Sequence, residues 1–293
     1  MNHGTATPKV HHHAFSAMGS PCEVQVECDD PALARRLGLL AEAEARRIED
    51  KYSRYRQTSF LTALNKSGGK PVTVDPETAG LLDYAGTCFA LSEGRFDITS
   101  GVLRKVWKFD GSDRVPDRAA VEAILPLVGW EKLGWQAPEL VLPEGMEIDL
   151  GGIGKEYAVD RAAIAIMQES DAPALINFGG DLRVTRPRAG DRRWRIVIDA
   201  VDASKGTPGL LEIGEGALTT SGDARRFLLK DGVRYGHILD PRTGYPVEHT
   251  PRSVTVAAPT CMQAGTLSTL AMLHGADAET FLATEGVQSW VLR

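Results

Sequence analysis

The sequence is poor in cysteine, in basic charge and in long apolar runs, and each shortage excludes a class of protein. Among 293 residues there are four cysteines, and their spacings fit neither a zinc signature nor a CxxC motif. The net charge of −6 and the absence of a lysine or arginine run argue against a nucleic-acid-binding surface. No apolar run reaches the roughly 18 residues that a membrane-spanning helix needs. We therefore expect a soluble protein whose cysteines are mostly buried free thiols.

The N-terminal segment MNHGTATPKVHHHAF is polar and lacks the charged and apolar regions of a secretory signal peptide. We expect a cytoplasmic protein from the sequence as written, with a periplasmic or membrane-anchored location as the alternative if an export signal is missing. Residues 1–13 are predicted to form a flexible leader, in which His11, His12 and His13 are polar side chains rather than a metal site. The sequence leaves monomer and dimer open.

Hydrophobic periodicity predicts an α+β fold in which strands and helices are interspersed and a hairpin is present. Asp30 and Asp75 each precede a proline and are the predicted N-caps of the first two helices. An Asp231-Gly232 turn between two apolar runs predicts the hairpin. The predicted strands are 22–28, 146–150, 174–177, 194–199, 253–257 and 290–292, and the predicted helices include 31–53, 76–91, 117–128, 155–168 and 260–273.

A glycine-rich junction, DLGGIGKEYAVD (149–160), joins the predicted strand 146–150 to a helix. Glycine allows a backbone to approach a ligand closely, and the start of a helix offers free N–H groups to a phosphate. Lys155 would add positive charge. The spacing is neither that of a Walker loop nor GxGxxG, so a phosphate site and a tight strand–helix turn both stay open.

Two further glycine–acid junctions follow, NFGGD (177–181) and TTSGD (219–223). Asp181 could hold a hydroxyl or a metal, or it could be an exposed acid beside a glycine turn. Ser221 fits a turn, a cap or the polar wall of a pocket, and the arginine pair 225–226 is either solvated or close to phosphates. Together the junctions indicate a large, polyphosphate-like ligand, whereas the missing GxGxxG and GxSxG motifs disfavour a nicotinamide enzyme and a serine hydrolase.

The stretch GHILDPRTGYP (236–246) places an ionisable pair, His237 and Asp240, beside a turn that needs only Pro241 and Gly244. Imidazole titrates near neutral pH, which makes His237 a candidate general base. Asp240 would fix either the tautomer of His237 or the turn itself. A structural role, in which His237 simply bonds a backbone carbonyl, stays open.

In their order and spacing these stretches resemble the ApbE-type FAD:protein FMN transferases. The matching stretches are FSAMGS (15–20), SRYRQTSFLTALN (53–65), GRFDITSG (94–101), DLGGIGKEYAVD (149–160), ALINFGGD (174–181), TTSGD (219–223), HILDPRTGYP (237–246) and TLSTLAMLHG (266–275). The resemblance implies one α+β domain over residues 14–293, made of two intertwined subdomains with mixed or antiparallel sheets and FAD in a cleft between two halves.

The resemblance also implies the reaction: Mg²⁺-dependent transfer of FMN from FAD to a serine or threonine hydroxyl of a target flavoprotein, with release of AMP. The target would carry a Ser/Thr-Gly-Ala-Thr type acceptor. Some members hydrolyse FAD instead. The implied metal ligands are the Gly154 carbonyl and the hydroxyls of Ser268 and Thr269. The implied FAD contacts are Met18, Tyr55, Arg95, Phe96, Asp97, Gly151, Tyr157, Asn177, Gly179, Gly180, Asp181, Ser221, His237 and Ile238.

The sequence departs from the family at Gly265, where the family usually has an aspartate. Glycine offers no carboxylate, and Mg²⁺ prefers hard, charged oxygen ligands. Water, the Gln263 amide or Glu156, where the family more often has glycine, could compensate, or the metal site is weak. Alternatively, Glu156 is a solvated first-turn glutamate that favours the helix dipole. The departure also keeps open a non-catalytic FAD-binding protein and an FAD pyrophosphatase.

Overall fold

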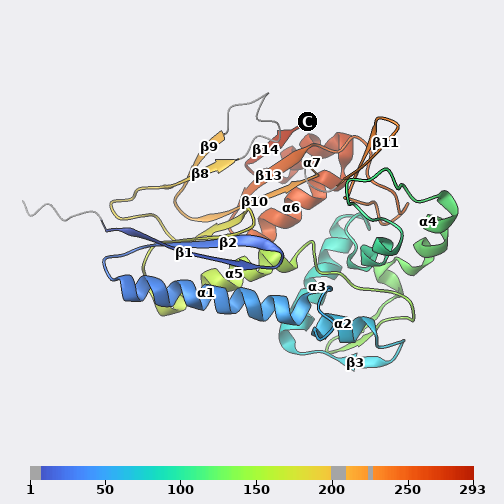
Figure 1. The fold of residues 1–293 in the computed structure, drawn as a ribbon, viewed down its shortest axis with the longest axis horizontal. Coiled ribbons are helices and arrows are strands. Elements are labelled where there is room, and N and C mark those ends of the chain that lie inside the picture. The colour runs from blue at the N-terminus through green and yellow to red at the C-terminus, as the bar shows by residue number, and fades with distance from the viewer. Residues whose placement is uncertain (1–7, 199–208, 224–226) are drawn as a thin grey trace, which may run out of the picture.

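The fold is built around one antiparallel sheet (Figure 1). The computed structural model describes residues 8–198, 209–223 and 227–293. Seven strands lie in the order β1-β2-β6-β7-β10-β13-β14, and every neighbouring pair is antiparallel. They are β1 (Val10–Ala17), β2 (Ser20–Glu27), β6 (Ala174–Phe178), β7 (Asp181–Val184), β10 (Gly216–Gly222), β13 (Ser253–Ala258) and β14 (Ser289–Leu292). The predicted α+β class is confirmed.

Both faces of the sheet are covered, because successive side chains of a strand point to opposite faces. Ile176 belongs to the large buried cluster that the sheet shares with helices α1, α5 and α6. Its neighbour Leu175 packs instead with Trp194 of the β8–β9 hairpin. These covering elements are α1 (Pro31–Tyr52), α5 (Gly154–Glu169), α6 (Cys261–Leu273), β8 (Trp194–Ile198) and β9 (Gly209–Ile213).

A second region lies beside the sheet and has its own buried cluster around Leu103, Trp107 and Val121 (Figure 1). Leu228, from much later in the chain, completes this cluster, so distant segments meet there. The remaining elements are α2 (Phe60–Asn65), β3 (Pro71–Thr73), α3 (Pro76–Leu91), η1 (Ile98–Lys105), α4 (Arg118–Ile124), η2 (Leu125–Leu127), η3 (Trp130–Lys132), β4 (Gly134–Gln136), β5 (Glu139–Val141), β11 (Phe227–Lys230), β12 (Val233–Gly236), η4 (Gly275–Asp277) and α7 (Ala278–Glu285).

The predicted helix starts and the predicted hairpin are confirmed. Asp30 caps α1 by accepting a hydrogen bond from the Ala32 N–H, and Asp75 caps α3 through two backbone N–H groups. The β11–β12 turn has positive φ at Asp231 and Gly232, as a two-residue hairpin with an Asp-Gly turn requires. All four cysteines are free thiols, and three of them are buried, whereas Cys28 is half-buried.

The N-terminal leader is shorter than the sequence predicted. Strand β1 begins at Val10, so the prediction of a flexible leader is wrong for residues 10–13, and residues 1–7 lie outside the described part. Each histidine has a partner: His13 Nε2 lies 2.8 Å from Glu42 Oε2 of α1. A Cβ atom at Gly38 would come within 2.6 Å of His13 Cβ, so the glycine lets the histidine pack against the helix.

The predicted strand 146–150 belongs to no sheet. Its apolar residues are buried, but its backbone pairs with a side chain: the Asn65 amide bonds both the N–H and the C=O of Ile148, at 2.8 and 2.9 Å. The Asp149 N–H donates to the Ile98 carbonyl at 2.8 Å. Alternating hydrophobicity therefore predicted the buried side chains of this segment correctly, but the prediction of a strand is wrong.

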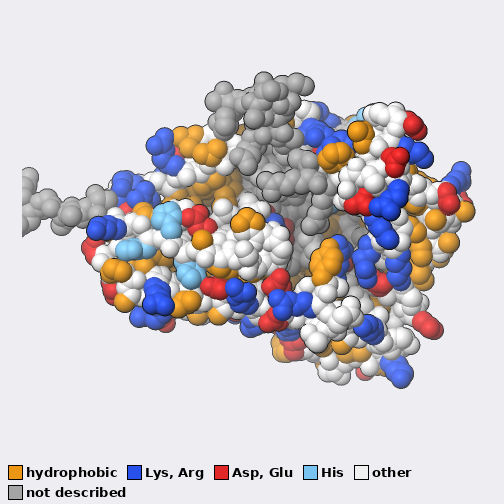
Figure 2. All heavy atoms as spheres, viewed as in Figure 1, with side chains coloured by type: hydrophobic (Ala, Val, Ile, Leu, Met, Phe, Trp, Pro, Cys, Tyr) orange, Lys and Arg blue, Asp and Glu red, His pale blue; other side chains and the backbone are white. Residues whose placement is uncertain are grey.

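The surface mixes both charge signs. Figure 2 shows acidic and basic side chains interspersed along α1 and around it, with the histidines of β1 beside them. Helix α1 is the longest described helix, and it carries arginines and glutamates throughout. Within residues 8–198, 209–223 and 227–293, no helix combines the length and the apolar character needed to cross a membrane.

Candidate functional site

The start of α5 lies at the glycine turn 151–154 and has no side-chain cap. The residue before the helix is Ile153, which offers no hydrogen-bonding side chain to the first-turn N–H groups. Helix starts with open N–H groups attract anions. The turn itself is tight, since the Gly154 N–H donates to the Leu150 carbonyl at 2.6 Å. Both interpretations of this junction, a tight turn and a helix start available to a phosphate, are therefore compatible with the structure.

Half-buried Lys155 and buried Asp181 form an ion pair beside this helix start. Lys155 Nζ lies 2.6 Å from Asp181 Oδ2, and only 1% of Asp181 is exposed. Burial raises the pKa of Asp181, and the Lys155 charge opposes that rise. Burial works against the charge of Lys155, but the negative charges of Asp181 and Glu156, with the hydrogen bond to Asp181, together outweigh it, so the pKa of Lys155 is raised. Asp181 is therefore not an exposed acid; it helps to keep the half-buried Lys155 protonated.

The turn that carries Asp181 needs both of its glycines. Gly179 and Gly180 have positive φ, and the Asn177 side chain accepts a hydrogen bond from the Gly180 N–H at 2.9 Å. A Cβ atom at Gly179 would come within 2.6 Å of Ser20 Cβ and 3.8 Å of Lys155 Nζ. This turn therefore brings β2, the β6–β7 hairpin and Lys155 together.

Glu156, the next residue of α5, is buried against α6. Its side chain lies over Gly265, where an added Cβ atom would be only 2.5 Å from Glu156 Cγ. The residue is 7% exposed, and its Oε2 accepts no hydrogen bond from any described residue. Burial, and next to it the charge of Asp181, raise the pKa of the Glu156 carboxyl. The interpretation of Glu156 as a solvated first-turn glutamate is wrong, because α6 covers it.

Three hydroxyl groups meet where β10 ends against α6. Ser221 Oγ lies 2.8 Å from Ser268 Oγ and 3.3 Å from Thr269 Oγ1. Ser268 Oγ also donates to the Gly265 carbonyl at 3.0 Å. Positions 265, 268 and 269 share one face of α6, because residues three and four apart are neighbours on a helix. The predicted metal ligands Ser268 and Thr269 therefore lie on the helix face that Glu156 covers.

The segment that carries His237 reaches the end of β10 through Gly236. A Cβ atom at Gly236 would lie 3.3 Å from Asp223 Oδ2, just beyond the end of β10. The His237 ring meets Phe109 edge-on, with ring centroids 6.3 Å apart. Ile238 packs between the main cluster and the cluster under β13 and α6. The arginine pair 225–226 lies outside the described residues.

Asp240 shapes the turn and holds Arg242. Its carboxylate accepts from the Arg242 backbone N–H at 2.9 Å and from the guanidinium at 2.6 Å. Of the two roles predicted for Asp240, the turn is the one the geometry shows. Burial raises the pKa of Asp240, but hydrogen bonds from Arg242 and the charge of half-buried Arg95 bring it below its ordinary value. Gly244 has positive φ, and a Cβ atom there would lie 2.8 Å from Val121 Cγ1, so the turn requires glycine.

Phe96 and Asp97 are buried, at 6% and 7% exposed. Asp97 caps η1: one oxygen accepts from the Thr99 N–H and hydroxyl, and the other accepts from the Trp130 N–H. The Phe96 ring lies 3.1 Å from where a Gly152 Cβ atom would be, so it packs beneath the glycine turn. Asp97, implied by the resemblance to be an FAD contact, thus serves as a structural cap here.

Tyr55 is the exposed aromatic residue of the predicted site. Its side chain is 73% exposed, its ring centroid is 4.9 Å from the Arg54 guanidinium carbon, and its hydroxyl accepts from Arg54 at 2.8 Å. Arg54 also pairs with Asp149, which accepts from the Gly151 N–H at 2.9 Å. Met18, in the β1–β2 turn with φ 52°, donates its N–H to Glu49. The ring of Tyr55 is open to stacking by a planar group.

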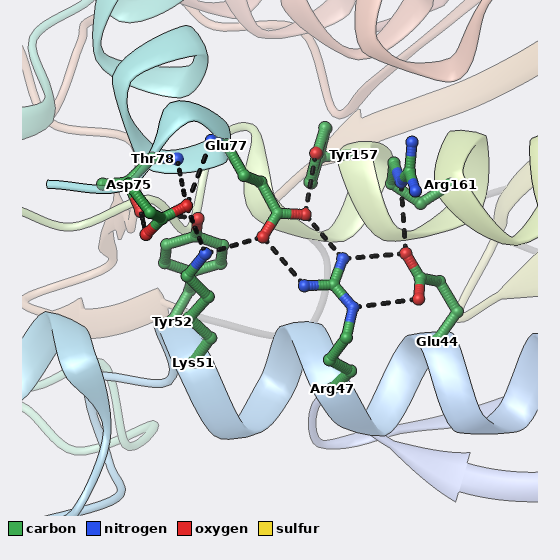
Figure 3. A network of polar contacts seen from close by, with 9 residues as sticks. All are labelled: Glu44, Arg47, Lys51, Tyr52, Asp75, Glu77, Thr78, Tyr157 and Arg161. Atoms are coloured by element: carbon green, nitrogen blue, oxygen red, sulfur yellow. Dashed lines mark hydrogen bonds and ion pairs between the residues drawn. The ribbon is translucent and has the colours of Figure 1, made fainter.

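Tyr157 belongs to a charged network that joins α1, α3 and α5 (Figure 3). Its hydroxyl donates to Glu77 Oε1 at 2.9 Å, and Glu77 also accepts from Arg47 and Lys51. Arg47 first, and then Lys51 and Tyr157, lower the pKa of Glu77 to about 2. The network comprises Glu44, Arg47, Lys51, Tyr52, Asp75, Glu77, Thr78, Tyr157 and Arg161. Tyr157, predicted to contact FAD, has its hydroxyl committed to this network.

Two hollows border the predicted site from different sides. One, of about 510 Å³, adjoins Ser20 and the β1–β2 turn; its lining residues are Ser16, Ala17, Gly19, Ser20, Pro21, Arg46, Glu49 and Arg56. The other, of about 600 Å³, adjoins Asp97, Pro241 and Arg242. Neither is lined by His237 or Ser221. Sequence reasoning missed Ser20, whose role depends on contact with Gly179, and Asp160, which accepts from the N–H groups of Cys261 and Met262 at the start of α6.

The fold and site together define an α+β protein in which a lysine paired with a buried carboxylate, an uncapped helix start and a row of hydroxyls come together, a combination suited to a phosphate-bearing ligand. The ApbE family profile matches residues 18–290. The FAD:protein FMN transferase of Salmonella typhimurium is 30% identical over 301 aligned positions, which cover 98% of this chain and 85% of the relative. That of Vibrio cholerae is 33% identical over 236, covering 78% and 70%. The chain therefore belongs to the ApbE family.

Solved structures agree with this assignment. The ApbE protein of Thermotoga maritima superposes with a TM-score of 0.88 at 30% identity, covering 97% of this chain and 94% of that one. The flavinyl transferase ApbE of Pseudomonas stutzeri gives 0.86 at 26% identity, covering 98% and 92%. The predicted family is therefore confirmed by sequence and by fold.

Proposed function

We propose that this protein is a flavin transferase that moves FMN from FAD onto a serine or threonine hydroxyl of a target flavoprotein and releases AMP. The family membership and the relatives named FAD:protein FMN transferase support this activity. The observation that carries it in this chain is the juxtaposition of Lys155, the start of α5 and the Ser221–Ser268–Thr269 hydroxyls. The target would present a Ser/Thr-Gly-Ala-Thr type acceptor.

Lys155 and the start of α5 would bind the diphosphate of FAD. Asp181 keeps Lys155 charged, and the burial of the pair strengthens the attraction of the lysine for an anion. The uncapped N–H groups of α5 add the positive end of the helix dipole. Tyr55 offers an exposed ring on which a flavin or adenine can stack.

The donor set fits a magnesium ion. Ser268 and Thr269 contribute hydroxyls and Gly154 a backbone carbonyl, all hard oxygen donors of the kind that Mg²⁺ prefers. The unpartnered oxygen of Glu156 lies over the same face of α6. When bound, the ion would supply charge neutralisation at the diphosphate.

His237 would accept the proton of the attacking hydroxyl. The hydroxyl oxygen bonds to the phosphorus of the FMN moiety, the phosphorus–oxygen bond to AMP breaks, and the proton moves to the imidazole. Phe109, which meets the His237 ring edge-on, would help to orient it. Asp240 acts at a distance, by shaping the turn through Arg242.

One assay tests the proposal against its alternatives. The protein is incubated with FAD, Mg²⁺ and an acceptor domain, and flavin fluorescence is followed on the denatured acceptor. Covalent fluorescence on the acceptor supports transfer. Release of free FMN alone would make the protein a pyrophosphatase. Intact, tightly bound FAD would make it a storage protein, the alternative that the missing carboxylate at Gly265 favours.

A further inference from the structure

Glu156 and Gly265 are complementary across the contact between α5 and α6. The glutamate side chain occupies the space into which any side chain at 265 would extend, since an added Cβ atom would lie 2.5 Å from Glu156 Cγ and 3.1 Å from Oε1. The carboxylate therefore reaches, from α5, the face of α6 that carries Ser268 and Thr269.

Three carboxylates lie around this contact, and two of them are paired with a positively charged side chain. Asp181 is paired with Lys155, and Asp160 is paired with Arg183 and with two backbone N–H groups of α6. Glu156 is 7% exposed, and its Oε2 accepts no hydrogen bond from the described residues. A buried carboxylate is strongly disfavoured unless a cation or a proton accompanies it. The cluster thus has a place for one further positive charge.

We propose that Glu156 is a carboxylate ligand of the divalent cation, supplied from α5 because α6 has glycine at position 265. The inference rests on the proposed function only in taking this cluster as the metal site. What it adds is the charged ligand, Glu156. The hydroxyls of Ser268 and Thr269 are neutral, so Glu156 provides the charge that a hard dication requires.

A charge-neutral variant and a swap variant test the assignment. Mn²⁺ is titrated into the full-length protein, with and without saturating FAD, and bound metal is measured by electron paramagnetic resonance. We expect Glu156→Gln to weaken Mn²⁺ binding by at least about tenfold. Glu169→Gln is the matched control, because Glu169 lies exposed at the far end of the same helix and pairs with Arg36; it should bind Mn²⁺ like the wild type.

The swap moves the carboxylate to the other helix. The double variant Glu156→Gly with Gly265→Asp should bind Mn²⁺ within about threefold of the wild type, well inside the tenfold or larger loss expected for removing a ligand. Gly265→Asp alone should bind no better than the wild type, because the new side chain collides with Glu156. If Glu156→Gln does not fold, the swap and the single Gly265→Asp variant still decide the question.

Melting temperatures separate a ligand from a merely structural residue. If Glu156 is a ligand, Glu156→Gln should leave the metal-free protein at least as stable as the wild type, because the unpartnered carboxylate stabilises nothing there, and should shrink the rise in melting temperature caused by Mn²⁺. A structural glutamate would give the opposite pattern. Unchanged Mn²⁺ affinity in Glu156→Gln, or no Mn²⁺ binding by the wild type even with FAD, overturns the inference. Mn²⁺ binding through Glu156 without flavin transfer would overturn the proposed function alone.

Discussion

The side-chain amide of Asn65 replaces a neighbouring strand for Ile148. Its Oδ1 accepts from the Ile148 N–H at 2.8 Å, and its Nδ2 donates to the Ile148 carbonyl at 2.9 Å. Because these contacts span 83 positions of the chain, they anchor the segment before the glycine turn of α5 to helix α2.

Removing this amide should destabilise the fold. Asn65→Ala leaves two buried backbone groups of Ile148 without partners, which should lower the free energy of unfolding by about 2–3 kcal/mol. Urea denaturation measures the loss. Gln57→Ala, at an exposed side chain that pairs with Lys66, is the control and should change stability by less than about 0.5 kcal/mol. An equal effect of the two substitutions would show that the Asn65 contacts do not support the segment.

Breaking the ion pair of Lys155 and Asp181 should lower the free energy of unfolding by more than removing the Asn65 amide does. Lys155→Met leaves Asp181 buried without its counter-charge, and we expect a loss of about 3–5 kcal/mol in unfolding free energy. Adding Asp181→Asn should recover a large part of this loss, because the uncompensated charge disappears. A double variant no more stable than Lys155→Met would contradict the pairing. FAD affinity, measured by flavin fluorescence quenching, should fall in both variants because the cation is absent.

The network around Glu77 should make stability depend on pH in acid. The folded-state pKa of Glu77 is lowered to about 2 from 4.5, so its contribution is complete above about pH 4.5 and is lost as the pH falls towards 2. Glu77→Gln should therefore be less stable than the wild type by about 1–2 kcal/mol at pH 6, and the difference should shrink towards pH 2. Denaturation at a series of pH values measures the slope. A constant difference across this range would contradict the assigned pKa.

His237 and Asp240 should differ in their effects on the reaction. His237→Asn removes the proposed base and should slow flavin transfer about 10²–10⁴-fold, while FAD binding stays near the wild-type level. Asp240→Asn weakens only the hold on Arg242, so its effect should be smaller and should appear as reduced stability of the turn. Single-turnover transfer rates and FAD titrations separate the two. Undiminished transfer by His237→Asn would remove the catalytic role.

Tyr55 should matter for binding and not for folding. Its ring is 73% exposed, so Tyr55→Ala should leave the melting temperature unchanged. If the ring stacks on FAD, the same substitution should weaken FAD binding about tenfold, and Tyr55→Phe should restore it. Isothermal titration calorimetry measures both. Equal FAD affinity in the wild type and Tyr55→Ala would exclude the stacking role.

Local signals predicted the helices well. Asp30-Pro31 and Asp75-Pro76 marked two starts because capping and proline preference act within a few residues. The sequence did not predict that residues 10–13 belong to β1, because this depends on β2 and on the space above Gly38. It did not predict that residues 146–150 lack a neighbouring strand, because their partner is the distant Asn65.

The candidate site, too, could be predicted from the sequence only in part. The sequence marked Glu156 and Gly265 as two departures from a pattern, but their contact depends on how α5 packs against α6. Tyr157 has the residue type expected of a ligand contact, yet Glu77, 80 positions away, holds its hydroxyl. Motifs thus marked candidate residues, and packing determines what each of their side chains can still bind.

The early start of β1 limits how the protein can be shortened. Removing everything before Ala14 would leave Val24, Gln25, Val26 and Glu27 of β2 with unpaired backbone groups along an outer border of the sheet. Such a border recruits other chains, and the shortened protein would aggregate or exchange strands between copies. Trimming that stops before Lys9 preserves the whole hairpin, so a protease that cuts within residues 10–13 would convert a monodisperse sample into a self-associating one.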